Sequence, residues 1–348
     1  MSLIVLVSLL SVATAQLVPS DKGNLIDVKF PIGKDLVDFI NSKATTFKAQ
    51  VYPRFENLSI ADLRQFLGAL SPTPEQAAIF QKQQPAEGPQ LTSAVSIPTS
   101  FDVRTKWPKC NGTFNAIPNQ ASKSSAYCGS CWAVSTASVI QDRRCILYNG
   151  SAKLPISSWD IVSCCFNCTP SDNGYCNGGY VYKAFDWFDT VGIVTGGQYG
   201  GEGCKPYEVA PGQSPPANRT CKKSCQASYT SPTYPNDKKK GGYNKIFYNN
   251  TAAAQAEILA NGSIVAQFDV YYDFYNYKSG IYQHVSGNYV GGHAVRLIGW
   301  GVDNGTQYWL AANSWGVDWG DKGFFKIRRG NNECNFEEWS FAGNVLKD

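Results

Sequence analysis

The chain has 348 residues, of which 43% are hydrophobic, 13% aromatic and only 17% charged. This composition excludes an intrinsically disordered chain, which is rich in charge and poor in aromatic side chains. The formal net charge of +4 is too small for a dedicated nucleic-acid-binding protein, so no nucleic-acid partner is expected. The one lysine run, Lys238–Lys240, is interpreted as a solvated loop.

Residues 1–15 have the pattern of a secretory signal peptide. Their apolar stretch, Leu3–Val12, is shorter than the roughly 20 residues that a membrane-spanning helix needs. It ends in Ala13-Thr14-Ala15, which suits signal peptidase; the alternative interpretation is a buried N-terminal strand. Because no other stretch is long and apolar enough to span a membrane, we expect a lysosomal or extracellular protein without a membrane span.

All twelve cysteines lie between Cys110 and Cys334. In an oxidising compartment this asymmetry predicts an N-terminal segment without disulfides and a disulfide-bonded remainder. Eight N-x-S/T triplets agree with glycosylation in the secretory pathway. They begin at Asn57, Asn111, Asn149, Asn167, Asn218, Asn249, Asn261 and Asn304.

The N-terminal part is expected to contain two helical patches and a linker. Apolar residues recur at helical spacing over residues 36–40, and a second patch, residues 59–70, has Ser59 as its N-cap. Residues 71–96 are rich in Pro, Gln and Ala, which predicts a linker or an extended segment. At Ile97 the chain becomes rich in Trp, Tyr, Gly and Cys, so a domain boundary is placed there.

Helices precede strands in the remaining residues. Three helices are expected, over residues 131–144, 181–191 and 251–261, the last with Thr251 as its N-cap. Four strands follow, over residues 264–272, 294–300, 307–312 and 323–327, with a tight turn at Asp303-Asn304-Gly305. Helices followed by an antiparallel sheet predict an α+β fold.

The chain has only two histidines, which narrows the search for a general base. His284 is interpreted as structural. His293 lies near the predicted hairpin, and counting outward from Asn304 makes Asn313 its diagonal neighbour on the same face, roughly 7–8 Å away between backbones. A shift of one residue would place the two side chains on opposite faces.

Cys131 is the candidate nucleophile, because a Gly-containing loop enters the predicted helix at this residue. The N-terminus of a helix favours thiolate over thiol, and a nearby imidazolium adds to this effect. The arrangement suits acyl transfer, in which the thiolate attacks a carbonyl carbon and water later hydrolyses the thioester. Asn313 would hold the tautomer of His293.

Two C-x-x-C pairs, Cys128/Cys131 and Cys165/Cys168, leave alternatives open. They could bind zinc, or one could be a thioredoxin-like redox pair. A secreted chain favours disulfides, no histidine lies nearby and no βαβ unit is expected. We therefore expect neither a metal nor a cofactor.

Three stretches resemble the papain family of cysteine peptidases, and most of all its cathepsin B-like members. They are CGSCW at residues 128–132, GGHAVRLIGWG at 291–301 and YWLAANSWGVDWGDKGFFKIRRG at 308–330. The resemblance implies a two-lobed α+β fold with a Cys-bearing central helix in a helical lobe, an antiparallel β-barrel-like lobe and a cleft between them. It divides the chain into signal peptide 1–15, propeptide 16–96 and peptidase domain 97–348.

The resemblance also implies residue roles. Cys131 becomes the nucleophile, His293 the general acid/base and Asn313 its orienter. Trp315 would shield the His–Asn contact beside the substrate site, and Gly178 and Gly179 would bind extended substrate. The implied disulfides are Cys110–Cys145, Cys128–Cys176, Cys164–Cys221, Cys165–Cys168 and Cys204–Cys225, which leaves Cys131 and Cys334 free.

This chain departs from the family pattern at three places. The oxyanion-hole glutamine is expected at Gln120, displaced by an insertion within residues 121–127. Residues 207–217 replace a histidine-bearing occluding loop by a shorter stretch without histidine, which predicts an open primed side and chiefly endopeptidase activity. Trp339 stands where an acidic residue closes the S2 pocket, which predicts apolar or aromatic P2 side chains.

The sequence therefore predicts a secreted or lysosomal cysteine protease that is made as a zymogen. Its expected partners are peptide and protein substrates and its own propeptide, which blocks the cleft. The alternatives are a non-catalytic homologue that acts as a secreted interaction protein, and a disulfide-bonded binding domain unrelated to catalysis.

Overall fold

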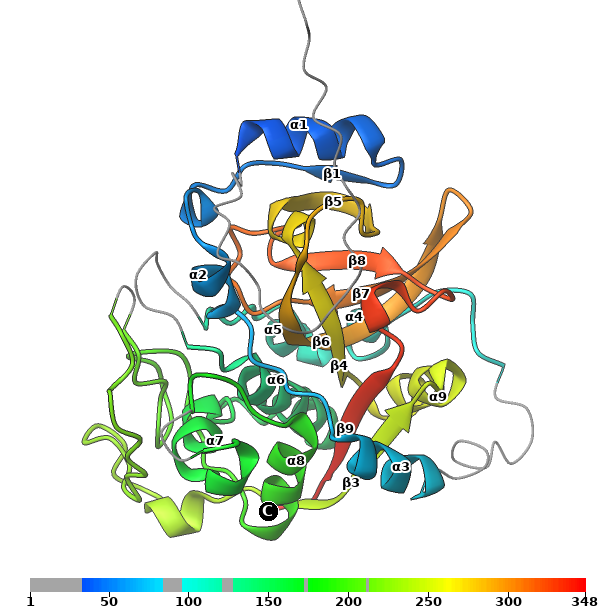
Figure 1. The fold of residues 1–348 in the computed structure, drawn as a ribbon. Coiled ribbons are helices and arrows are strands. Elements are labelled where there is room, and N and C mark those ends of the chain that lie inside the picture. Colours follow the sequence, from blue (N-terminus) through cyan, green and yellow to red (C-terminus); the bar gives the residue numbers. More distant parts are fainter. Residues whose placement is uncertain (1–32, 84–95, 121–127, 172–174, 211–212) are drawn as a thin grey trace, which may run out of the picture.

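A computed structural model describes residues 33–83, 96–120, 128–171, 175–210 and 213–348 (Figure 1). The expected signal peptide lies outside these residues. The helices are α1 Lys34–Lys43, α2 Ile60–Arg64, α3 Pro74–Gln83, α4 Val103–Lys106, α5 Asn111–Phe114, α6 Cys131–Leu147, α7 Ser158–Cys164, α8 Val181–Thr190 and α9 Thr251–Asn261. The strands are β1 Phe47–Ala49, β2 Phe101–Asp102, β3 Gly241–Tyr248, β4 Ile264–Tyr271, β5 Tyr277–Tyr282, β6 Tyr289–Asp303, β7 Thr306–Ala312, β8 Phe324–Arg328 and β9 Trp339–Val345.

The strands form one open sheet in the order β1-β5-β8-β7-β6-β4-β9-β3, with β2 paired to β6. Neighbouring strands are antiparallel except β5 and β8, which run parallel. The α+β class is therefore confirmed, whereas the barrel-like lobe is corrected to an open sheet. The edge of β5 is occupied by β1 from the N-terminal segment, and the sheet ends at its other edge with β3.

Helix α6 lies at the centre of the helical part, as predicted, and extends to Leu147 rather than Arg144. Its small residues Ala133, Ser135 and Ala137 are buried, which lets neighbouring elements approach the helix closely. One apolar core joins α6 to α7 and α8, and a second core fills the space between the sheet and the N-terminal segment. None of the described helices is long and apolar enough to cross a membrane.

Three local predictions need correction. Part of the expected linker is the helix α3, because Thr73 and Gln76 cap each other's backbone N–H and Pro74 opens the helix. The N-cap of α9 is Asn250, whose side chain accepts from the amide of the third helical residue. The lysine run is only partly solvated, since two of its members form ion pairs and Lys240 alone is exposed.

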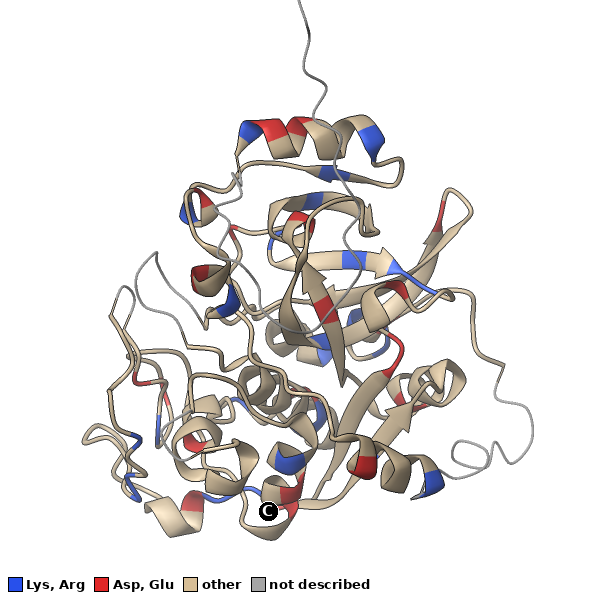
Figure 2. Ribbon diagram, viewed as in Figure 1, with Lys and Arg blue, Asp and Glu red and all other residues tan. Residues whose placement is uncertain are grey.

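Five disulfides are present, and they are the pairs that the family resemblance implies. Cys131 and Cys334 are free. In the view of Figure 2, basic and acidic residues alternate over the ribbon without forming a continuous basic stripe. Among the described residues, no group of acidic, histidine and cysteine side chains is arranged to hold a metal ion.

Candidate active site

Cys131 is the first residue of α6, and its thiol is free and fully buried. The backbone N–H groups of Trp132 and Ala294 lie close enough to its sulfur to lower the pKa of the thiol. The loop that enters α6 is fixed on its other side by the disulfide between Cys128 and Cys176. The sulfur therefore lies where the N-terminus of α6 meets β6, directly beside the backbone that follows His293.

His293 and Asn313 lie together, as the hairpin count predicts. His293 Nε2 is 2.8 Å from Asn313 Oδ1, and this oxygen also accepts the backbone N–H of Ser314 at 2.8 Å. Because Oδ1 is an acceptor, the proton of the neutral imidazole is assigned to Nε2, and Nδ1 carries the lone pair. Nδ1 is buried and has no hydrogen-bond partner among the described residues. The ring is thus held by one nitrogen and left available at the other.

A bulge in the β6–β7 ladder produces this neighbourhood. On either side of Ile298 the ladder pairs Gly299 with Leu310 and Leu297 with Ala311. Continued from the two-residue turn without the bulge, the register would place Asn313 opposite Arg296, on the face away from His293. The extra residue at Ile298 shifts the pairing by one and brings the amide and imidazole to one face.

Trp315 covers the His–Asn contact. Its ring centroid is 5.0 Å from that of His293 and 5.0 Å from that of Tyr275, and its side chain is fully buried. The surrounding aromatic rings separate the hydrogen bond between His293 and Asn313 from solvent.

Gln120 is held against the site although residues 121–127 lie outside the described chain. Its backbone N–H donates to the carbonyl of Ser314 at 3.0 Å, and its Oε1 accepts the Ser314 hydroxyl at 2.5 Å. Its Nε2 donates to the carbonyl oxygens of Cys128, at 3.2 Å, and Phe66, at 3.1 Å. The amide group therefore faces the cysteine loop, and a carbonyl of the N-terminal segment occupies it. Ser314 is a supporting residue that the sequence reasoning missed.

The N-terminal segment crosses the site after α2 and continues to α3, as Figure 1 shows. Gly68 and Ala69 donate their backbone N–H groups to the Gly292 carbonyl, each at 3.1 Å. Gly179 donates to the Gly68 carbonyl at 2.9 Å and accepts the Leu70 N–H at 3.0 Å. The segment thus bridges β6 and the strip before α8, which the family resemblance implies as the binding strip for extended substrate.

Glycine is required at both positions of that strip. Gly178 has a φ of +114°, which favours glycine. A Cβ on Gly179 would come within 2.5 Å of the Trp132 ring. Close backbone approach at this strip therefore depends on the absence of side chains.

Burial holds the candidate pair in its uncharged form. It raises the pKa of the Cys131 thiol to about 12, although backbone N–H groups of Trp132, Gly68, Ala69 and Ala294 act in the opposite direction. It lowers the pKa of His293 to about 4, partly offset by the bond to Asn313. Between pH 5 and 8 the covered site therefore contains a thiol and a neutral imidazole.

Trp339 lies at the start of β9, 5% exposed, in an aromatic group. Its ring centroid is 4.4 Å from that of Tyr248 and 6.3 Å from that of Phe80 of α3. Glu337, a neighbouring carboxylate, accepts the backbone N–H groups of Gly330 and Asn332 instead. The Trp339 ring therefore packs among aromatic rings, while its indole N–H donates to Glu338 Oε1 at 3.1 Å.

The second histidine has a structural environment, as interpreted. His284 Nδ1 lies 3.2 Å from both carboxylate oxygens of the fully buried Asp273, which also accept two backbone N–H groups and the Tyr282 hydroxyl. The ring stacks on Tyr271 with centroids 4.0 Å apart. His284 therefore anchors the turn after β5.

Comparison with known proteins agrees with this geometry. Residues 97–343 match the papain family cysteine protease domain. The gut-specific cysteine proteinase of Caenorhabditis elegans is 42% identical, with 89% of this chain and 90% of that protein covered. Cathepsin B-like cysteine proteinase 5 of the same organism is 39% identical, with 89% and 90% covered. The solved structure of proCathepsin B S9 from Trypanosoma congolense is 34% identical, with a TM-score of 0.75 over 91% of this chain and 99% of that chain. The chain therefore belongs to the papain family of cysteine proteases, among its cathepsin B-like members.

Proposed function

We propose that Cys131, His293 and Asn313 form the catalytic group of this protease. The observation that carries the proposal is the 2.8 Å bond from His293 Nε2 to Asn313 Oδ1, which leaves Nδ1 without a partner among the described residues. The residue after His293, Ala294, directs its backbone N–H toward the sulfur of Cys131, a free cysteine at a helix N-terminus. The presence of all three residues disfavours the two non-catalytic alternatives, because a protein without catalytic activity would not need a free cysteine, a buried imidazole and an amide at one place.

In the proposed reaction, Cys131 loses its proton to His293, and the thiolate attacks the peptide carbonyl carbon. The carbonyl oxygen becomes an oxyanion, and His293 returns the proton to the leaving amine as the C–N bond breaks. Water then attacks the thioester, His293 accepts a proton from that water, and the thiol is restored as the acid product leaves. Asn313 keeps the imidazole oriented through both steps.

Gln120 is the proposed oxyanion donor. The Ser314 hydroxyl holds its amide group through Oε1, and its Nε2 already donates to the carbonyl oxygens of Phe66 and Cys128. Gln120→Ala is expected to lower kcat by about 10²–10³-fold with little change in KM, since the bond strengthens as charge develops on the oxygen. Steady-state kinetics on one peptide substrate measure this effect. Unchanged kcat in a correctly folded variant would remove Gln120 from the oxyanion hole.

We further propose that residues 16–96 are an inhibitory propeptide and that cleavage near Ile97 releases the enzyme. Two sets of contacts support this proposal. Gly68 and Ala69 donate their backbone N–H groups to the Gly292 carbonyl, and the Phe66 carbonyl accepts a hydrogen bond from Gln120 Nε2. While these contacts hold, the covered site keeps Cys131 protonated and denies substrate the strip at Gly179. We also propose that the chain enters the secretory pathway, is glycosylated there and reaches the lysosome or the extracellular space.

The mature enzyme is proposed to be chiefly an endopeptidase with apolar or aromatic P2 preference. The stretch that replaces the occluding loop turns Tyr207 inward onto Trp159, and the tyrosine at position 175 donates its hydroxyl to the Pro216 carbonyl. Neither histidine of the chain lies there, so no imidazole is available to bind a substrate carboxylate. The aromatic rings around Trp339 favour an apolar or aromatic P2 side chain, and the neighbouring Glu338 carboxylate is already bonded to the Trp339 indole N–H.

The zymogen itself tests this function. Expressed zymogen is acidified, its new N-terminus is sequenced, and a blocked internal peptide library with varied P2 is digested. We expect an N-terminus near Ile97 and cleavage of internal bonds whose P2 residue is apolar or aromatic. Sequential release of C-terminal dipeptides would contradict the endopeptidase assignment, and a preference for Arg at P2 would contradict the assignment of Trp339.

A further inference from the structure

The loop that carries Tyr207 also reaches the residue next to the nucleophile. The Tyr207 hydroxyl lies 2.7 Å from Ser130 Oγ, and both side chains are buried. Building on the proposed catalytic role of Cys131, we propose that Tyr207 is a positioning residue. It holds the Ser130 hydroxyl away from the N-terminus of α6 and so reserves the backbone N–H groups there for the Cys131 sulfur.

The argument starts from the capping position of Ser130. A serine at the N-cap normally turns its hydroxyl oxygen onto the N–H of the second or third helical residue. Ser130 is the N-cap of α6, yet its side chain makes no capping bond. Its Oγ instead donates to the Cys128 carbonyl at 3.4 Å and lies against Tyr207. With the serine proton directed at that carbonyl, the tyrosine hydroxyl is the donor in the 2.7 Å bond.

The amide that this arrangement spares is that of Trp132, the second residue of the helix. The N–H of Ala133, the third residue, already donates to the Ser130 carbonyl at 2.9 Å. The Trp132 N–H instead faces the sulfur of Cys131, where it lowers the pKa of the thiol and so favours the ionised form. A Ser130 hydroxyl released from Tyr207 would compete for this N–H and withdraw it from the sulfur.

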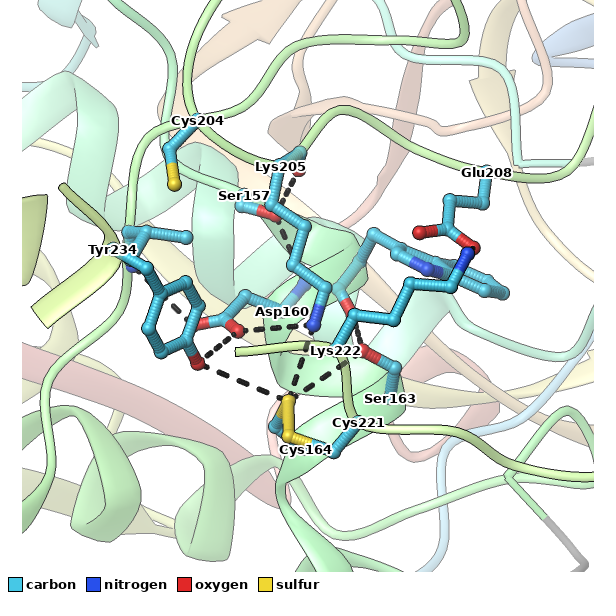
Figure 3. A network of polar contacts seen from close by, with 12 residues as sticks. Ser157, Asp160, Ser163, Cys164, Cys204, Lys205, Glu208, Cys221, Lys222 and Tyr234 are labelled. Carbon is cyan, nitrogen blue, oxygen red and sulfur yellow. Dashed lines mark hydrogen bonds and ion pairs between the residues drawn. A yellow bond between two sulfur atoms is a disulfide. The ribbon is translucent and has the colours of Figure 1, made fainter. Parts of the chain in front are cut away.

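A rigid frame fixes Tyr207 in place, and Figure 3 shows its centre. The disulfide at Cys204 begins the loop, and the buried Lys205 ammonium lies 3.3 Å from an Asp160 carboxylate oxygen. The Lys205 carbonyl accepts the Ser157 hydroxyl at 2.5 Å. Two residues on, Tyr207 donates its backbone N–H to the Gly197 carbonyl at 2.9 Å.

The Tyr207 ring is held as firmly as its backbone. Its centroid is 5.1 Å from that of Trp159 of α7. Burial raises the pKa of Tyr207 above its usual range, so the phenol stays protonated and able to donate at every pH at which the enzyme works. The hydroxyl is therefore presented to Ser130 in one fixed position.

The test uses mature enzyme from the wild-type zymogen and from Tyr207→Phe, Ser130→Ala and the double variant. The rate of Cys131 alkylation by iodoacetamide is measured from pH 3 to 9, with kcat/KM beside it. Tyr207→Phe keeps the ring on Trp159 and is expected to raise the apparent pKa of the Cys131 thiolate by about one unit. Alkylation below that pKa then slows about tenfold.

Ser130→Ala removes the hydroxyl that competes for the Trp132 N–H, so it is expected to cancel the effect of Tyr207→Phe. The double variant and Ser130→Ala alone should therefore show the same Cys131 pKa. Tyr175→Phe is the matched control, because Tyr175 also packs on Trp159 but bonds the Pro216 carbonyl. It should leave the thiolate pKa unchanged.

Three results would overturn the proposal: an unchanged pKa in Tyr207→Phe, a pKa shift that survives Ser130→Ala, or a raised pKa in Ser130→Ala alone. Lower thermal stability of Tyr207→Phe without a pKa shift would assign the tyrosine a structural role only. If Tyr207→Phe does not fold, Ser130→Ala alone still tests the proposal, because a raised Cys131 pKa in that variant would overturn it. Failure of the proposed function is distinguishable, because wild-type Cys131 would then lack a low-pKa thiolate altogether.

Discussion

Alkylation of Cys131 at pH 6 is expected to be about 10²–10³-fold slower in the intact zymogen than in the enzyme cleaved near Ile97. With the pKa of the covered thiol raised to about 12, only about one molecule in a million is ionised at pH 6. Thiols activated by a helix N-terminus and an imidazolium have pKa values down to roughly 3.5, and those with a pKa below about 5 are largely ionised at pH 6. A low-pKa thiolate is a weaker nucleophile, which reduces the rate advantage of the cleaved enzyme by about 10³–10⁴-fold.

The pH profile separates ionisation from simple shielding. Because the zymogen thiol has a raised pKa, its rate should rise about tenfold per pH unit throughout the range below 12. The alkylation rate of the cleaved enzyme should not change with pH above its own thiolate pKa. A Cys334→Ser background ensures that the label reports Cys131, since these two cysteines are the free ones. Equal rates and profiles in zymogen and enzyme would contradict control of ionisation by the propeptide.

Gly68→Ala is expected to make the unprocessed zymogen leak activity. A Cβ on Gly68 would lie 1.9 Å from the backbone oxygen of Gly129, and neither backbone can yield without breaking its own bonds. Moving the segment breaks its four backbone bonds to Gly179 and Gly292. At about 1 kcal/mol each, a loss of roughly 4 kcal/mol weakens docking by about 10³-fold. Initial hydrolysis rates of full-length zymogen at neutral pH measure the leak.

Gly33→Ala is the matched control for this variant. It makes the same chemical change in the same segment, but its Cβ would meet no atom within 4 Å. It should leave the zymogen silent. A Gly68→Ala zymogen as inactive as the wild type would show that the close approach at Gly129 does not hold the propeptide in place.

Short-range signals in the sequence were sufficient for several elements. Ser59 caps α2 with a full capping box, α6 begins where Ser130 ends the glycine-containing loop, and Asn304-Gly305 forms the turn of the β6–β7 hairpin. Each depends on residues a few positions apart, whose preferences the surrounding fold reinforces. The helix α3 carried such a signal as well, in Thr73 and Gln76, but its Pro- and Gln-rich composition favoured a linker instead.

The hairpin count reached the right neighbours through two errors that cancelled. It took Asn304 as a one-residue turn centre, whereas Asp303 pairs with Thr306 across a two-residue turn. The bulge at Ile298 then shifts the register by one and restores the face of Asn313. Nothing local to Ile298 marks a bulge, because the extra residue is fixed by packing on both faces of β6.

By itself, the sequence determined the chemistry: a free cysteine at a helix start, one usable imidazole, an amide to orient it, and the family to which these belong. The tertiary structure decided the state of that chemistry. It places the Phe66 carbonyl in hydrogen-bond contact with Gln120, the backbone of Gly68 beside Cys131, and the Tyr207 hydroxyl against Ser130. The members of these pairs lie more than fifty residues apart in the chain. Their meeting follows from the closure of the whole fold, which no local preference encodes.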